Sequence, residues 1–473
     1  MKKSFLSFIL ITAFTVLPAV AQTQNTEYSI QVNDKITIGT RRAYECTALI
    51  AHLAGFQEFN LADYQQYYKP YDDYFSQFMK DKRVVNAISH YKKIRNYGFS
   101  YDAIANFATY LSSDCHSFRT TDEKILKENI QNRCGDIKEL QQVIADFYDA
   151  TDFEYFYQTQ LPVYEQIAQY LYSYKDTMIT GLNELEKYYR AEVNGIFISA
   201  SFLTGPNNFG VSFTDGKNTW FEPQYGAGYF DANLFIHELS HPFSNKAVDE
   251  IIKNKKIMKL VKKDFKGEKK KIMQDQAYGY VETYLYELFN RANTNNILKG
   301  FCDEIYVARS IAYDKKRRFD EIAEVTEILD RYMLGDYENI YAFLPELEKE
   351  YINILQTVDT KPKPFKLSDD DTSSFVFLGK TYEAEYCGMQ DLTGFNDYVC
   401  RKYWRLKDAY QNVCNYSVTD YLPYNNYPFK VNEGEVFRIE YLKKDGTGFI
   451  EYLRADSGDE INGEPVTRGF YME

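Results

Sequence analysis

Apolar residues return at helical spacing through most of this chain. Across residues 61–192 they recur every three or four positions, as in Ile104, Phe107, Ala108 and Leu111. This is the period of a helix that buries one face. The same periodicity predicts one long helix over residues 162–189 and further helices from residue 231 to about residue 355. The pattern therefore predicts a frame made mostly of helices.

A different pattern interrupts the helices in the middle of the chain. Residues 195–203 form an almost unbroken run of apolar and small side chains, and residues 209–213 form a second run after the sequence Gly205-Pro206-Asn207-Asn208. Short runs bounded by Gly, Pro and Asn are typical of strands and turns. We therefore expect a small β-sheet immediately before a helix for which Asp231 is the N-cap.

Near residue 361 the pattern changes again. Lys-Pro-Lys-Pro at 361–364 and three aspartates at 369–371 break the helical periodicity. Residues 435–442 then alternate apolar with polar side chains, and Asp445-Gly446 turns the chain into residues 449–453, which is a hairpin signal. We expect an α+β protein with two folded parts, a mostly helical domain over residues 22–360 and a β-rich module over residues 361–473.

The first residues have the features of an export signal. Lys2 and Lys3 precede an apolar run over residues 5–17, and Ala19-Val20-Ala21 offers the small residues of a cleavage site. We expect cleavage near Ala21 and a mature protein in the periplasm or outside the cell. The run is too short to span a bilayer and no second one follows, so no integral membrane segment is expected.

The composition narrows the set of partners. Of the 473 residues, 45% are hydrophobic and 26% are charged, which is typical of a folded globular protein. The formal net charge is −13, and an acidic chain repels phosphate backbones. These values exclude extensive disorder and argue against a nucleic-acid partner.

The clearest chemical motif is the HExxH pattern His237-Glu238-Leu239-Ser240-His241. Residues four apart share one face of a helix, so both imidazoles can reach one metal ion. Neutral imidazole is a preferred ligand of zinc, and Glu238 could take a proton from a water held there. Pro242 follows directly and removes one backbone N–H from the helix.

A catalytic zinc site needs a third protein ligand, and residues 276–292 predict a helix that offers two candidates. Glu282 and Glu287 are five residues apart, which is about 140° around a helix, so only one of them can face the ion. Arg291 lies one turn after Glu287 and could hold a ligating carboxylate in place. This favours Glu287, and Glu282 remains the alternative.

Four further residues could serve this site. Tyr284 and Tyr280 lie one and two turns before Glu287, and a phenol there could stabilise an oxyanion. Asn245 follows His237 by eight residues and could bond an imidazole or the substrate. Asn208 lies between the two predicted strands, where an edge strand could bind a peptide through main-chain hydrogen bonds. A helix cap and a hairpin turn are the alternative interpretations of the two asparagines.

The motif together with a glutamate on a later helix resembles the gluzincin type of zinc metallopeptidase. A closer resemblance is to an uncharacterised family of exported bacterial proteins, in which HExxH is followed by Phe and Asn and then by E-x-x-x-R-A. Here these are residues 237–241, Phe243, Asn245 and residues 287–292. The resemblance implies a zincin-like helical domain, zinc ligands at His237, His241 and Glu287, and a general base at Glu238. It implies no particular substrate.

Two functions follow as hypotheses. The first is an exported zinc-dependent hydrolase with one Zn²⁺, in particular a metallopeptidase that cleaves a peptide or protein. The second is a non-catalytic surface protein that binds glycan or protein through its 44 Tyr and 34 Phe, with a vestigial or structural metal site. Metal content separates them, because one zinc held by three side chains and a water favours the enzyme.

Overall fold

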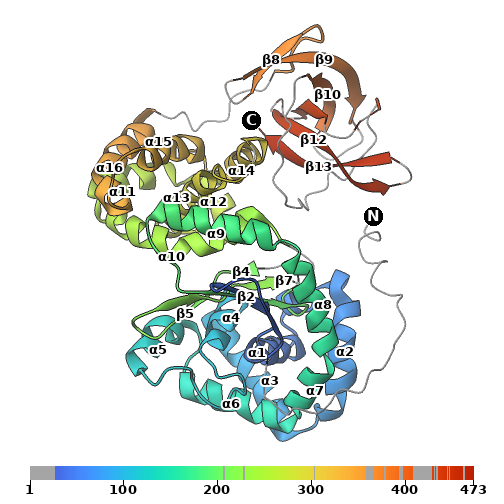
Figure 1. The fold of residues 1–473 in the computed structure, drawn as a ribbon, viewed down its shortest axis with the longest axis vertical. Coiled ribbons are helices and arrows are strands. Elements are labelled where there is room, and N and C mark those ends of the chain that lie inside the picture. Colours follow the sequence, from blue (N-terminus) through green and yellow to red (C-terminus); the bar gives the residue numbers. More distant parts are fainter. Residues whose placement is uncertain are drawn as a thin grey trace.

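The structure, a computed structural model, describes residues 27–472 apart from residues 206–207, 227–229, 303, 358–365, 378–379, 394–397, 408–428, 431, 433–434, 445, 447 and 462–463. The chain has the expected mixed α+β architecture. Three parts follow one another along its long axis: an N-terminal lobe of helices and a sheet, a central group of helices, and a C-terminal sheet (Figure 1). The predicted signal peptide (residues 1–21) and the predicted boundary at residue 361 lie outside the described residues.

The helices of the N-terminal lobe pack their apolar stripes into one core. Several begin at an aspartate whose side chain accepts a hydrogen bond from a backbone N–H of the first turn, as at Asp81, Asp122 and Asp136. The helices are α1 (Arg42–Leu53), α2 (Gln65–Phe75), α3 (Lys82–Ile94), α4 (Tyr101–Thr109), α5 (Glu123–Ile130), α6 (Ile137–Ala150), α7 (Phe153–Thr159) and α8 (Leu161–Tyr172). The helical periodicity of residues 61–192 is thus confirmed.

The single helix predicted over residues 162–189 is wrong, because the chain breaks it into α8 and α9 (Lys175–Tyr189). At the break, the Ser173 hydroxyl donates to the carbonyl of Tyr170 at 2.6 Å, and Tyr174 leaves helical geometry with φ −96° and ψ 12°. A serine side chain competes in this way with the backbone hydrogen bonds of a helix. The break lets α9 join the central helices while α8 stays in the N-terminal lobe (Figure 1).

A seven-stranded sheet lies at the upper edge of the N-terminal lobe. Its strands are β1 (Ser29–Gln31), β2 (Ile36–Gly39), β3 (Ile196–Ser201), β4 (Asn208–Phe209), β5 (Ser212–Thr214), β6 (Thr219–Phe221) and β7 (Gln224–Gly226). The predicted strand at 195–203 is confirmed as β3. Its parallel partner β2, in register at Ile36 and Ile196, was not predicted. The strand expected over residues 209–213 is interrupted at Gly210 and Val211, between β4 and β5.

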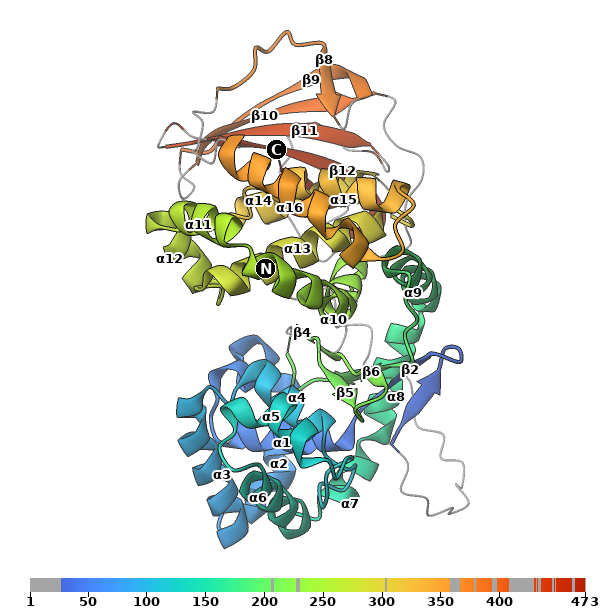
Figure 2. The same cartoon turned by 90° about the vertical axis from the view of Figure 1, so that its left-hand side faces the viewer.

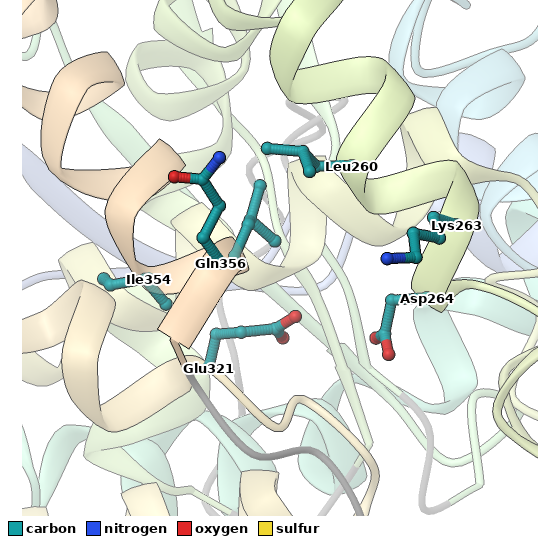
Figure 3. A pocket seen from close by; sticks show the side chains of 7 residues that line it. Leu260, Lys263, Asp264, Glu321, Ile354 and Gln356 are labelled. Carbon is teal, nitrogen blue, oxygen red and sulfur yellow. The ribbon is translucent and has the colours of Figure 1, made fainter.

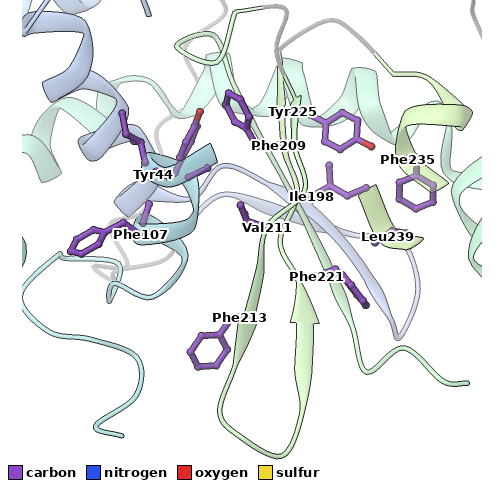
Figure 4. Close-up of a cluster of buried hydrophobic side chains, with 14 of the residues drawn as sticks. Tyr44, Phe107, Ile198, Phe209, Val211, Phe213, Phe221, Tyr225, Phe235 and Leu239 are labelled. Carbon is purple, nitrogen blue, oxygen red and sulfur yellow. The ribbon is translucent and has the colours of Figure 1, made fainter. Parts of the chain in front are cut away.

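Apolar side chains bury both faces of this sheet (Figure 4). One face packs on α1 and α4 through residues such as Tyr44 and Phe107, and the other lies against α10 (Ala232–Lys253), which contributes Phe235 and Leu239. Ile198 of the central strand is fully buried between them. Each such buried side chain contributes about 1.5–3 kcal/mol. This packing fixes α10, which carries the HExxH motif, relative to the sheet.

The central helices pack around the pair α10 and α13 (Val281–Leu298), and α10 faces β4 where the two parts meet (Figure 2). The others are α11 (Lys255–Asp264), α12 (Gly267–Asp275), α14 (Glu304–Lys316), α15 (Ile322–Leu334) and α16 (Ile340–Thr357). Among the described residues, none of the helices combines the length and apolarity needed to traverse a membrane.

The C-terminal part is an antiparallel sheet, which agrees with the predicted β-rich character. Its strands, in spatial order, are β8 (Ser374–Phe377), β9 (Lys380–Asp391), β10 (Tyr398–Leu406), β11 (Val436–Lys443), β12 (Gly448–Ile461) and β13 (Glu464–Met472). The predicted hairpin is the β11–β12 pair, with Gly446 at φ +82° in its turn. The sheet contacts α14, where Ala308 packs into its core and Glu304 pairs with Lys380 at 3.1 Å.

Candidate metal centre

Helix α10 presents both histidines of the motif on one face. The carboxylate of Asp231 accepts the N–H of Asn233 at 2.7 Å, so the predicted N-cap is confirmed. The helix continues through Pro242 to Lys253. Directly after the proline, the ring of Phe243 stacks on Tyr189 at 4.7 Å and approaches Phe221 at 6.2 Å. These contacts hold the second half of the helix where one backbone hydrogen bond is missing.

Three side chains converge between α10 and α13. The Nε2 atoms of His237 and His241 are 3.2 Å apart. The carboxylate of Glu287 places Oε2 3.6 Å from His237 Nε2 and Oε1 3.5 Å from His241 Nε2. All three residues could hold a single metal ion. The structure therefore brings together the two predicted imidazoles and one of the two candidate carboxylates.

The carboxylate in this cluster belongs to Glu287, and Glu282 lies outside it. Both residues are on α13, which packs along α10. The rotation of about 140° between them, expected for five helical residues, turns Glu282 away from the imidazoles. The alternative left open by the sequence is resolved in favour of Glu287 as the cluster's third member.

Two asparagines orient the imidazoles. Asn245 Oδ1 lies 3.3 Å from Nδ1 of His241, in line with the predicted role of Asn245. The Asn290 amide lies 3.2 Å from Nδ1 of His237 and donates to the His237 carbonyl at 2.9 Å. Because the Asn245 oxygen can only accept, its contact places the ring proton on Nδ1 of His241 and leaves the lone pair of Nε2 directed at the cluster. Asn290 was not predicted, although it follows Glu287 by three residues on the same helix and so lies on a neighbouring face.

A buried arginine fixes the Glu287 carboxylate. Arg291 donates to Glu287 Oε2 at 3.1 Å and to Oδ1 of Asp314, on α14, at 2.7 Å. The Tyr278 hydroxyl lies 3.5 Å from the same guanidinium. The predicted pairing of Arg291 with Glu287 is thus present. Asp314 and Tyr278 were not predicted, because neither position shares a sequence motif with the ligands.

The electrostatics of the cluster favour the protonation states that bind metals. Burial lowers the pKa of His237 well below its ordinary value, and the positive charges of Arg291 and Arg317 act in the same direction. Burial opposes ionisation of Glu287, but the neighbouring His237 ring and Arg291 lower its pKa to about 2. A neutral imidazole and an ionised carboxylate are the forms that donate electron pairs to a cation.

Glu238 lies against the sheet on the β4–β5 side. Its carboxylate accepts a hydrogen bond from the backbone N–H of Gly210. A Cβ at position 210 would lie only 2.9 Å from the Cβ and Cδ atoms of Glu238, closer than such atoms approach. Its poorly hydrated surroundings raise the pKa of Glu238 to about 7, and the Glu287 carboxylate adds to the shift. Such a carboxyl can both accept and release a proton near neutral pH.

No protein-family model, no curated protein and no solved structure matches this chain. The chemistry of the site therefore follows from its own atoms: two imidazoles, one ionised carboxylate and a neighbouring acid whose pKa lies near 7.

The two predicted oxyanion donors are not in the cluster. Tyr284 is fully buried, its ring stacks on Phe319, and its hydroxyl donates to Glu321. Tyr280 is the N-cap residue of α13 and is 77% exposed. Three residues on a helix span about 300°, which leaves Tyr284 about 60° away from the face of Glu287. The position of Tyr284 does not support the role predicted for it. A different phenol, that of Tyr278, contacts Arg291 at 3.5 Å.

Glu321, the partner of Tyr284, also lines a cavity of about 420 Å³ beside α11 and α16 (Figure 3). The other lining residues are Leu260, Lys263, Asp264, Ile354, Leu355 and Gln356. None of the metal-cluster residues lines this cavity. Tyr284 thus bonds to a residue of the cavity wall and not to the cluster.

Asn208 takes part in the sheet. Its side-chain Oδ1 accepts the N–H of Gly226 at 3.1 Å, which ties β4 to β7 across their antiparallel pair. The side chain of Asn208 therefore stabilises the strand pair, and the expected main-chain pairing of a peptide with this edge stays a prediction. Asn207 lies outside the described residues. Within the described part of the chain, β4 pairs only with β7 and is an edge strand.

Proposed function

We propose that this protein is a zinc-dependent hydrolase that cleaves peptide bonds. The observation that carries the proposal is the convergence of His237, His241 and Glu287, whose ligand atoms lie 3.2–3.6 Å apart. Two atoms each about 2.1 Å from one tetrahedral ion are separated by about 3.4 Å. The three side chains therefore have the spacing of ligands around a shared zinc, with a fourth position left for water or substrate.

The residues around the ligands support zinc over other metals. Two histidines four apart on one helix, with a glutamate directly after the first, form the ligand pattern of zinc hydrolases. Glu238 is not a member of the ligand set and lies beside it, as a proton carrier should. When bound, the zinc would act as a Lewis acid on a substrate carbonyl and make a neighbouring water more acidic.

Residues of this chain would transfer the proton and hold the ligand side chains in place. Glu238, with a pKa of about 7, can remove a proton from the attacking water and deliver it to the leaving amine. The Gly210 N–H holds the Glu238 carboxylate, and Arg291 holds that of Glu287 at 3.1 Å. Asn245 and Asn290 set the imidazole planes. No step assigned to these residues requires Tyr284.

A peptide is the substrate class that suits the surroundings of Glu238. The edge strand β4 ends at Phe209, immediately before the glycine that contacts Glu238. An extended peptide can pair with such an edge through main-chain hydrogen bonds, which would bring its carbonyl groups past the cluster. We therefore favour an extended polypeptide over a compact small molecule.

Peptide cleavage that depends on the metal is the test of this function. The purified chain, incubated with a mixed-sequence peptide library and followed by mass spectrometry, is expected to generate new termini. Dialysis against a chelator should abolish the cleavage, and about one equivalent of Zn²⁺ per chain should restore it. Cleavage that persists without metal, or a zinc-loaded chain that cleaves no peptide, would contradict the proposal.

Replacing Gly210 by Ala tests the contact between β4 and Glu238. The new methyl group would displace the Glu238 carboxylate, because it would lie 2.9 Å from Glu238 Cβ. We expect kcat to fall by up to about 100-fold, the scale of a small displacement of a reacting group, with zinc content unchanged. Ser212→Ala, in the adjacent β5, is the matched control and should retain activity. A Gly210→Ala enzyme with normal kcat would refute this contact's role.

A further inference from the structure

Arg317, at the end of α14, carries a guanidinium held in a defined orientation. Its Nε donates to Oε1 of Gln276 at 2.7 Å, and Nε2 of Gln276 donates back to the Arg317 carbonyl at 3.1 Å. The Cζ atom lies 6.0 Å from the ring centre of Tyr278 and 5.6 Å from that of Tyr313. One amide and two rings thus fix the group, at cation–π distance for both rings.

Within the described residues, Arg317 forms no ion pair and its Nη atoms donate no hydrogen bond. The neighbouring arginines differ, because Arg291 pairs with Glu287 and Asp314 while Arg318 pairs with Asp320 at 3.0 Å. Burial raises the pKa of the Asp314 carboxyl, and the charge of Arg317 acts against this shift and favours ionisation, but Arg317 makes no direct ion pair with that group. Arg317 is only half-buried, beside the partly exposed Tyr313, so an outside group can reach it.

Arg317 is connected to the metal cluster by a short chain of contacts. It lies over the ring of Tyr278, whose hydroxyl is 3.5 Å from Arg291, and Arg291 contacts Glu287 at 3.1 Å. An extended peptide advances by about 3.3 Å per residue. These contacts place Arg317 within the length of a few extended residues of the cluster.

We propose that Arg317 binds a carboxylate of the peptide substrate, a few residues from the scissile bond. This inference rests on the proposed peptidase function and defines its substrate class. The two outer nitrogens of a guanidinium form paired hydrogen bonds with a carboxylate, which an ordinary amide oxygen matches less well. The carboxylate can belong to the peptide's C-terminus or to an Asp or Glu side chain, and the geometry serves both.

The net negative charge of the protein makes a cation that binds substrate carboxylates useful. A chain with a net charge of −13 repels acidic peptides at long range, and the cluster itself contains the ionised Glu287. A fixed cation without a direct ion pair offsets this repulsion locally. Together with burial, the charges of Arg291 and Arg317 both lower the pKa of His237. Of these two arginines, Arg291 is already paired with two carboxylates, which leaves Arg317 for the substrate.

Binding, measured separately from turnover, tests the inference. The zinc-loaded Glu238→Gln chain is titrated into three hexapeptide pools built from uncharged residues and labelled with an uncharged coumarin: one with a free C-terminus, one amidated, and one amidated with a single Glu at each position in turn. We expect about 10- to 100-fold tighter binding to a pool with a carboxylate than to the amidated pool, the range of a charge-assisted hydrogen bond. The pool that binds identifies the source of the carboxylate.

Variants of Arg317 and of a neighbouring lysine test whether Arg317 causes the preference for a carboxylate. Adding Arg317→Gln should remove the difference between the pools to within about 2-fold, Arg317→Lys should keep part of it, and Lys315→Gln, an exposed neighbouring charge, should keep all of it. Equal binding of the three pools, absence of binding to all of them, or a preference that survives Arg317→Gln would overturn the inference. Cleavage assays with Glu238 intact report separately on the proposed function, which can stand while this inference fails.

Discussion

Replacement of Glu238 by Gln is expected to lower kcat for peptide cleavage by about 10²- to 10⁴-fold, the usual contribution of a positioned general base. Gln keeps the size of the side chain but cannot take a proton. Because Glu238 is outside the ligand cluster, the zinc content of the variant should stay near one per chain. KM should change little, since the amide still accepts the Gly210 N–H. Steady-state kinetics and elemental analysis on the same sample provide both readouts.

The matched control is Glu250→Gln, an exposed glutamate on the same helix whose one ion pair within the described part of the chain is with Lys253 at 2.7 Å. It should retain kcat and zinc. If Glu238→Gln cleaves peptides as fast as the parent, Glu238 is not the base and the proposed mechanism fails. If the variant instead loses its zinc, Glu238 is part of the ligand set and the geometry has been misassigned.

The second large effect is expected from Glu287→Ala, which should weaken zinc binding by more than about 100-fold. Loss of an outer contact to a ligand costs 10- to 100-fold, and loss of the ligand itself should cost more. The change also leaves Arg291 with Asp314 as its only carboxylate among the described residues. Competition with a chromophoric chelator measures the affinity directly. Activity should fall in parallel at limiting zinc.

Glu282→Ala is the control for this variant, because it removes a carboxylate from the same helix that lies outside the cluster. Its zinc affinity should match that of the parent. The opposite result, with zinc lost on replacing Glu282 and kept on replacing Glu287, would show that α13 turns Glu282 and not Glu287 toward the two histidines.

Local signals in the sequence were sufficient to predict the three residues of the cluster. His237 and His241 are one turn apart and Arg291 lies one turn from Glu287, and both relations follow from helical periodicity. Asp231 caps the helix of the two histidines because it lies immediately before its first residue. The β11–β12 hairpin likewise followed from alternation and a turn. These features could be predicted because the interacting groups are neighbours along the chain.

Features that depend on distant segments were missed. Strand β2 pairs with β3 across 160 residues, as in Ile36 with Ile196, and nothing local in residues 36–39 indicates a parallel partner. Asp314 reaches Arg291 from another helix. Tyr284 was misjudged because a spacing of three residues leaves a 60° offset, which in this packing directs the ring to Phe319 and Glu321. Tertiary packing decided each of these cases.

Anomalous diffraction at the zinc absorption edge, from crystals of the zinc-loaded chain, tests the central claim most directly. The proposal predicts one strong peak per chain, about 2.0–2.2 Å from Nε2 of His237, Nε2 of His241 and a carboxylate oxygen of Glu287, with no further side chain in the coordination sphere. The claim would be contradicted by a peak elsewhere, by the absence of any peak in crystals grown with saturating zinc, or by a fourth protein ligand that closes the site.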